Sequence, residues 1–148
     1  MAMLYQAEIS ILEALLNEGV RSVVIGGAAV QHHGHTRSRD DLDILVEPTP
    51  ENASRVVAAI GAKFRFTDEH LKGLAKPGVQ MHLGGACPVE VLTSVQGVDT
   101  KAAIDTAVMV WCGPVHVPVL ALDMLLATKR ARGSDTDLAD IEALTNQF

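Results

Sequence analysis

The feature that most restricts the fold is a short apolar run that stops at a pair of glycines. Ser22 to Ile25 is β-branched and apolar without alternation, which is typical of a strand buried on both faces of a sheet. Gly26 and Gly27 follow directly, and Ala28 to Gln31 then favours a short helix. A chain with such a segment needs packed layers on both sides of a sheet.

Helical and strand patterns alternate along the rest of the chain. Apolar residues at 9, 12, 15 and 16 share one helical face, and Thr49-Pro50-Glu51 is a helix start with a hydroxyl cap. Pro118 interrupts a strand pattern and places that strand near a sheet edge. We expect strands at 22–25, 42–46, 79–83, 89–92 and 115–120, and helices at 9–16, 28–31, 50–61, 122–132 and 137–145. The pattern predicts an α/β (α+β) fold with a mixed central β-sheet flanked by helices, a hairpin of 79–83 with 89–92, and no assignment for 62–78.

Length and charge limit the classes of protein that fit. The chain has 148 residues, 48% of them hydrophobic and 20% charged, so residues 1–148 are expected to form a single domain. Lys and Arg number 12 against 18 Asp and Glu, and the net charge of −6 disfavours a general nucleic-acid-binding surface. Aromatic residues make up only 3%, too few for a platform on which bases stack.

The cysteines and the N-terminal segment indicate a reducing compartment. Cys87 and Cys112 have neither the spacing of a disulfide framework nor that of a zinc site. The N-terminal segment carries Glu8, Glu13 and Glu18 without a basic start, unlike a secretory signal peptide. No uncharged apolar run reaches the length of about 18 residues that a membrane span requires. A cytoplasmic protein without membrane association is therefore expected.

Two aspartates at the start of a strand are the strongest chemical signal. Asp41 and Asp43 are two residues apart, so the strand repeat puts both carboxylates on one face. Ionised carboxylates held close together repel each other, and a divalent cation such as Mg²⁺ offsets that cost. Glu90 completes a three-carboxylate site for two metal ions if strand 89–92 lies beside the first strand. The alternative is a plain acidic charge run that includes Asp40.

Gly26 and Gly27 stand where a backbone can approach a ligand closely. Glycines between a strand and a helix leave room for a phosphate, and the helix N-terminus that follows favours anions. An ordinary tight turn explains the pair equally well. The aspartates that follow the glycines give the phosphate interpretation its weight.

The order of these motifs resembles the minimal nucleotidyltransferase branch of the DNA polymerase beta superfamily. The resemblance rests on Val24-Ile25-Gly26-Gly27, Arg37, Asp41-Leu42-Asp43 and Glu90, and it covers most of the chain. It implies that Gly26 and Gly27 hold nucleotide phosphates. It also implies that Asp41, Asp43 and Glu90 are the catalytic residues and bind Mg²⁺ in a two-ion site, for which Mn²⁺ is a substitute.

The activity implied by this resemblance is transfer of a nucleoside monophosphate from a nucleoside triphosphate to a hydroxyl of a tRNA, a protein or a small molecule. Lys129 and the segment Asp137-Leu138-Ala139-Asp140-Ile141 are similar to the end of a bacterial subgroup that includes nucleotidyltransferase toxins of toxin–antitoxin and abortive-infection systems. An antitoxin or a second subunit is the partner that this subgroup implies. A non-catalytic nucleotide-binding or regulatory module on the same fold is the alternative.

Three cations are candidate nucleotide-binding residues. Arg37 and Arg39 either bind a triphosphate or neutralise the neighbouring acids. Lys129 resembles a triphosphate-contacting residue, although cations near a helix end also interact favourably with the helix dipole. Arg39 stands where the subgroup often has Thr in Arg-x-Thr-x-Asp-x-Asp. The chain also lacks the large helical domain that recognises the acceptor in many relatives, so the acceptor is not specified.

Overall fold

The computed structural model describes residues 4–146, so both ends of the expected domain 1–148 lie outside the described residues. Its strands form one mixed sheet in the order β3-β4-β2-β1-β6-β5. The strand bounds are Ser22–Ile25 for β1, Leu42–Val46 for β2, Gln80–Leu83 for β3, Val89–Leu92 for β4, Val108–Cys112 for β5 and Val115–Val119 for β6. Pairs β1–β6 and β2–β4 are parallel, and β1–β2, β3–β4 and β5–β6 are antiparallel. The predicted mixed sheet and the hairpin of β3 and β4 are confirmed.

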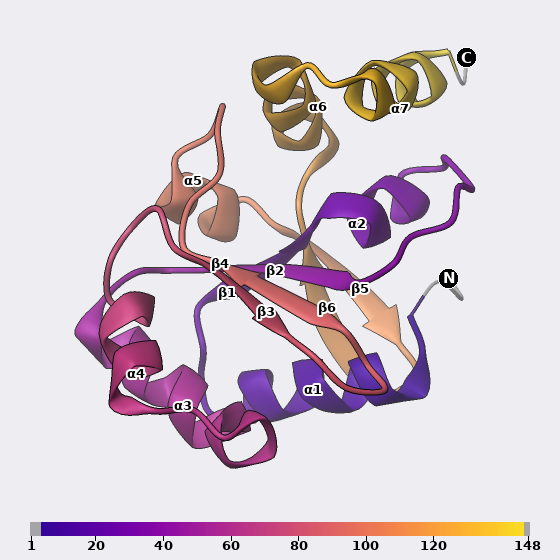
Figure 1. Ribbon diagram of the computed structural model, residues 1–148. Helices are drawn as coiled ribbons and strands as arrows, with labels where there is room; N and C mark the ends of the chain where they lie inside the picture. Colours follow the sequence, from indigo (N-terminus) through magenta and orange to yellow (C-terminus); the bar gives the residue numbers. More distant parts are fainter. Residues whose placement is uncertain (1–3, 147–148) are drawn as a thin grey trace.

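Helices cover both faces of this sheet. The helix bounds are Gln6–Asn17 for α1, Gly26–His32 for α2, Pro50–Phe64 for α3, Asp68–Leu74 for α4, Thr100–Asp105 for α5, Leu122–Arg132 for α6 and Asp135–Thr145 for α7. In Figure 1, α1, α3 and α4 lie on one side of the strands, and α2, α5, α6 and α7 lie on the other. The α/β architecture flanked by helices is therefore as predicted.

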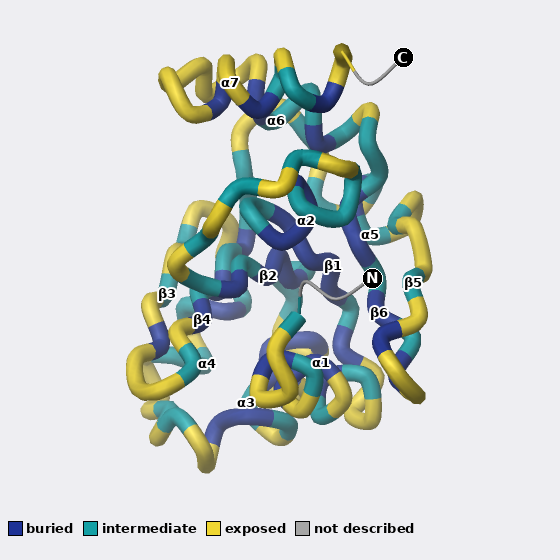
Figure 2. The backbone as a smooth tube through the Cα atoms, turned by 90° about the vertical axis from the view of Figure 1, so that its right-hand side faces the viewer, coloured by how far each residue is buried: buried dark blue, intermediate teal, exposed yellow. Residues whose placement is uncertain are grey.

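The central strands are buried because their side chains meet a helical layer on each side. All four residues of β1 are buried, and Val23 is 0% exposed. In β2, every residue except Asp43 is buried. Figure 2 shows these strands as a buried layer between the two helical layers. Asp43 therefore stands as a polar side chain in an otherwise apolar central strand.

The elements that the sequence pattern missed are short or weakly buried. Segment 62–78, which supported no assignment, contains the end of α3 and the seven-residue helix α4, whose buried residue is Leu74. Helix α5 has six residues and buries Ala103. Strand β5 lies at the edge of the sheet, and its Trp111 is 64% exposed. The apolar residues of β5 are therefore less buried than those of a central strand. The strand that contains Pro118, β6, is paired with β1 on one side and with β5 on the other. It is therefore the strand next to the edge and not an edge strand of the kind that proline favours.

Helix length also bears on the expectation of no membrane span. Within residues 4–146, the helices are too short or too polar to cross a lipid bilayer.

Candidate active site

A row of side chains in register across the sheet forms the floor of the site. Asp43 in β2 is the partner of Ile25 in β1 and of Glu90 in β4, and Glu90 is opposite His82 in β3. Directly opposed residues of neighbouring strands share a face of the sheet. Asp41 immediately precedes β2, and the repeat of two puts its side chain on the same face. The expected adjacency of Glu90 to the aspartates is thus observed, and its catalytic role stays a prediction.

The carboxylate of Asp43 is the least satisfied polar group of this row. Its Oδ1 is buried and has no hydrogen-bond partner among residues 4–146. Burial, together with the charges of Asp41 and Glu90, raises the pKa of Asp43 to about 8. Buried polar atoms in native proteins nearly always have a partner. An orphaned carboxylate oxygen beside two further acids is the donor chemistry that a hard divalent cation satisfies.

Gly26 lies directly against this carboxylate. Its φ is +63°, and a Cβ atom at this position would lie 2.1 Å from Oδ2 of Asp43. A Cβ atom at Gly27 would lie 2.7 Å from Cβ of Arg39. Real Cβ atoms do not approach other atoms so closely, so Asp43 and Arg39 require glycine at both positions. The contact of this glycine pair with nucleotide phosphates remains a prediction.

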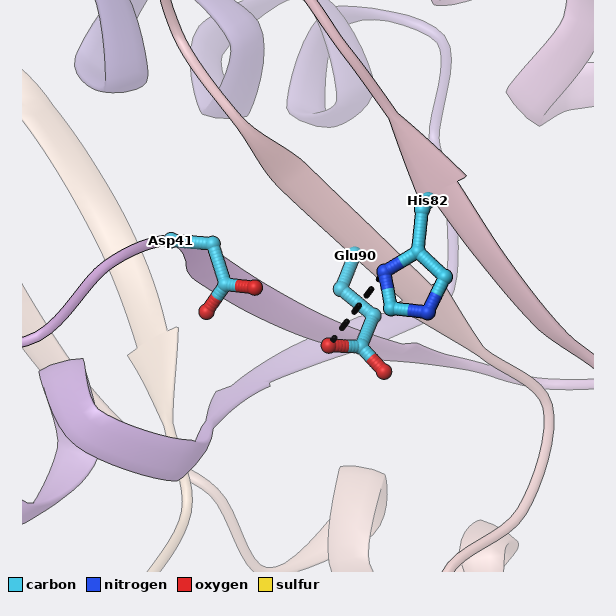
Figure 3. A group of neighbouring side chains, drawn as sticks. All are labelled: Asp41, His82 and Glu90. Carbon is cyan, nitrogen blue, oxygen red and sulfur yellow. Dashed lines mark ion pairs between the residues drawn. The ribbon is translucent and has the colours of Figure 1, made fainter.

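We call Asp41, Asp43 and Glu90 the acidic row. A second set of potential metal ligands overlaps it. Asp41, Glu90 and His82 each offer one atom, and these atoms all lie within 4.8 Å of one another. Figure 3 shows Glu90 between the other two side chains, with the His82 ring beside its carboxylate. Nδ1 of His82 is 3.9 Å from Oε2 of Glu90. The residues present therefore fit a divalent cation by their donor atoms as well as by their charge.

The acidic row lines a cavity of about 620 Å³. The end of β1, strands β2, β3 and β4, the loop before β2 and helix α6 all contribute to its wall. The lining includes the acids Asp41, Asp43 and Glu90 and the cations Arg37, Lys129 and Arg132. A cavity that presents carboxylates and cations together suits a phosphate-bearing ligand that carries a divalent cation.

The cations on the α6 side are held by two buried aspartates of α7. Lys129 is 4% exposed, and its Nζ is 3.2 Å from Oδ1 of Asp137 and 3.0 Å from Oδ2 of Asp140. Arg37 donates from Nε to Asp140 at 2.7 Å, and Arg132 donates from Nε to Asp137 at 2.8 Å. The two aspartates are 0% exposed. We call these five residues the α7 clamp.

Charge compensation in the α7 clamp keeps both aspartates ionised. The hydrogen bond from Arg132 lowers the pKa of Asp137 despite its burial, with further hydrogen bonds from Ser134 and Lys129. Burial alone raises the pKa of Asp140, but hydrogen bonds from Arg37 and Lys129 outweigh it and lower this pKa. The clamp therefore fixes the position of Lys129 and Arg37 at the cavity wall.

Arg39 has a different set of neighbours. Its side chain is 5% exposed, and its two terminal nitrogens donate to the Glu8 carboxylate of α1 at 2.6 Å each. It also donates to the backbone oxygen of Asp41 at 3.0 Å. Arg39 thus neutralises a distant acid and supports the backbone of Asp41. A contact between Arg39 and a triphosphate stays a prediction.

Sequence reasoning named Asp137 and Asp140 only as part of a resembling segment, and it did not place Glu8 or His82 in the site. Glu8 lies on the buried face of α1 with Ile11, Leu12 and Leu15, so the helical repeat could have identified it as a buried acid. Asp137 and Asp140 are three apart and share one helical face, which is a recognisable pattern for one shared partner. His82 carries no comparable signal, because its role depends on the register of β3 against β4.

Comparisons with known proteins add no family assignment. Neither the available models of protein families nor the curated protein sequences contain a match to this chain. The functional interpretation therefore relies on the motif residues and on the geometry of the cavity.

Proposed function

We propose that the chain is a magnesium-dependent nucleotidyltransferase of the kind its motifs resemble. The observation that carries this proposal is the buried, unpartnered Oδ1 of Asp43, flanked by Asp41 and Glu90 at the floor of a cavity. Three converging carboxylates destabilise one another, and a protein keeps such an arrangement where a cation compensates it. The cations Arg37, Lys129 and Arg132 in the lining of the same cavity suit the phosphates of a nucleotide.

Asp41, Asp43 and Glu90 would hold the magnesium. Bound Mg²⁺ supplies positive charge that stabilises the entering and leaving oxygens of a phosphoryl centre. Glu90, at the outer side of the row, accepts the proton of the acceptor hydroxyl. Gly26 keeps the backbone free of side-chain atoms where the triphosphate would approach. Lys129 offsets phosphate charge from the α6 wall.

The proposed reaction conserves atoms and charge in a simple way. The acceptor oxygen forms a bond to the α-phosphorus, the bond from that phosphorus to the bridging oxygen breaks, and pyrophosphate leaves with that bond pair. The acceptor proton goes to the carboxylate of Glu90. The product is a nucleoside monophosphate ester of the acceptor.

Calorimetric titration of each nucleoside triphosphate tests the proposal. We expect binding in the presence of Mg²⁺, loss of binding in EDTA, and loss of binding in a variant with Asp41→Ala and Asp43→Ala. Asp68→Asn is the control, because Asp68 is an exposed acid at the start of α4, outside the lining of the cavity. Binding that persists in the double variant with EDTA would show that the acids do not form the nucleotide site.

The acceptor is proposed to be a hydroxyl of a tRNA, a protein or a small molecule. For the toxin alternative, expression is expected to arrest growth, and Asp41→Asn is expected to abolish the arrest. Co-expression of an antitoxin encoded beside the chain would restore growth. Growth unaffected by the active protein, with transfer to a small molecule in vitro, would argue against the toxin role.

The second candidate function is a non-catalytic nucleotide-binding or regulatory module. It is favoured by the α7 clamp, because Lys129 is committed to two carboxylates and only 4% exposed. The module predicts nucleotide binding without release of pyrophosphate. Turnover measured as pyrophosphate release, lost in Glu90→Gln, distinguishes the enzyme from the module.

A further inference from the structure

His82 is placed beside the acidic row by the register of an edge strand. It is the partner of Glu90 in the β3–β4 pair, so it shares the face that carries Glu90 and Asp43. Its side chain is 73% exposed, so packing in the core does not explain its orientation. The ring lies beside the Glu90 carboxylate on the side away from Asp41 (Figure 3).

The separation of His82 and Glu90 does not match a direct hydrogen bond. Nδ1 of His82 is 3.9 Å from Oε2 of Glu90, beyond the range of a hydrogen bond. Two ligands of one octahedral ion with bonds of about 2.1 Å lie about 3.0 Å apart when adjacent and about 4.2 Å apart when opposite. The observed separation falls between these two values. It leaves room for an ion that both side chains contact.

Asp41 completes this set. One atom from each of Asp41, His82 and Glu90 lies within 4.8 Å of the other two, and the exposed histidine is free of packing that would prevent a small rotation toward the carboxylates. The set offers two oxygen donors and one nitrogen donor. The unpartnered Oδ1 of Asp43 lies in the same row and independently indicates a cation there.

We propose that His82 is a nitrogen ligand of the metal site and biases it toward a first-row transition ion over Mg²⁺. This inference rests on the proposed function, because it concerns the same metal site. Magnesium prefers oxygen ligands, whereas imidazole suits borderline ions, whose affinities exceed those of Mg²⁺ at sites with nitrogen donors. The imidazole therefore decides which ion occupies the position nearest Glu90.

The first test uses Mn²⁺ alone with the full chain, followed by electron paramagnetic resonance. Pulsed spectra of the Mn²⁺ complex are expected to show coupling to an imidazole nitrogen. His82→Gln is expected to remove this coupling, and His70→Gln is the matched control. His70 lies in α4, and glutamine there can still accept from the backbone N–H of Thr67.

The second test compares metal affinities by calorimetry. Loss of an outer partner of a ligand already weakens metal binding by about 10–100-fold. Co²⁺ gains more from a nitrogen ligand than Mg²⁺ does, so His82→Gln is expected to weaken Co²⁺ binding by at least about tenfold. Mg²⁺ binding is expected to change less than about threefold, since its oxygen ligands remain. His70→Gln is expected to change neither affinity.

The outcomes separate this inference from the proposed function. Mn²⁺ binding that depends on Asp43 but shows no nitrogen coupling would overturn the role of His82 and leave the nucleotidyltransferase proposal standing. Absence of any divalent-ion binding by the wild type would overturn both. Equal weakening of Co²⁺ and Mg²⁺ binding in His82→Gln, with circular dichroism unchanged, would overturn the ligand role and make His82 a residue that only positions Glu90.

Discussion

Asp43→Asn tests whether the charged carboxylate of Asp43 destabilises the folded chain when no cation is bound. The pKa of Asp43 is about 8 in the folded chain and near 3.8 in the unfolded chain, so the folded state holds this proton more tightly. The contribution of the protonated Asp43 carboxyl to the free energy of unfolding is fully present below pH 3.8. It is lost as the pH rises to about 8. Asparagine has nearly the same size and stays neutral at every pH. Without metal, the variant should therefore be more stable than the wild type above pH 8.

The size of this effect follows from the environment of one oxygen. A buried acceptor without a partner costs about 1–3 kcal/mol, and more when charged, so the ionised carboxylate exceeds the neutral amide in this cost by an amount of the same order. An unfolding entropy of about 2.1 cal/mol/K per residue gives about 0.3 kcal/mol/K for a chain of this length. The variant should thus melt about 3–10 °C above the wild type at pH 8.5 in EDTA. At pH 5 the difference should shrink, because the wild-type carboxyl is then protonated when folded.

In the presence of Mg²⁺, the wild type should recover most or all of the difference in melting temperature from Asp43→Asn. At a concentration 100 times its dissociation constant, a ligand that binds only the folded state stabilises it by about 2.7 kcal/mol, which corresponds to about 9 °C here. The wild type should gain this increment and Asp43→Asn should not. Differential scanning fluorimetry at pH 5 and pH 8.5, with EDTA or Mg²⁺, measures all four conditions, and Asp68→Asn serves as the control. A variant that melts below the wild type at pH 8.5 in EDTA would refute the argument.

The remaining predictions concern the neighbours of this carboxylate. Gly26→Ala should destabilise the fold by about 2 kcal/mol or more in urea unfolding, because its Cβ would meet Asp43 and its φ is +63°; an unchanged midpoint would contradict the contact. Asp140→Asn should cost about 3–5 kcal/mol in the same assay, since it leaves Lys129 buried with an incomplete set of partners; a loss below about 1 kcal/mol would contradict the clamp. Glu90→Gln should keep the melting temperature within a few degrees while pyrophosphate release falls at least about 100-fold, as expected for loss of a general base; full activity would remove Glu90 from the mechanism.

The central part of the fold was predictable because it is encoded locally. Residues 22–25 and 42–46 are predicted within their observed bounds, since strands buried on both faces need continuous apolar runs. The common face of Asp41 and Asp43 follows from the strand repeat alone. Glu90 lies beside them only because β2 pairs with β4. The sequence pattern did not establish this pairing, so it could only be assumed.

The rest of the site depends on contacts between distant segments. Glu8 pairs with Arg39 across 31 positions, and Arg37 pairs with Asp140 across 103 positions. No local periodicity encodes such pairings. The edge strand β5 was missed for a different reason. Its apolar residues Met109 and Trp111 are exposed, so β5 is not the buried strand that a continuous apolar run usually indicates. Sequence patterns therefore identified Asp41, Asp43 and Glu90 better than the residues that hold the cations.

The α7 clamp has a consequence for the order in which the site matures. During synthesis, Gly26, Asp41 and Asp43 leave the ribosome long before Asp137 and Asp140, and a contact across 103 positions forms only after a large loop closes. A partly synthesised chain would carry the acids of the site before the aspartates that orient its cations. Lys129 and Arg37 would then reach their fixed positions only when α7 docks, so the cavity would be completed in one late step of folding.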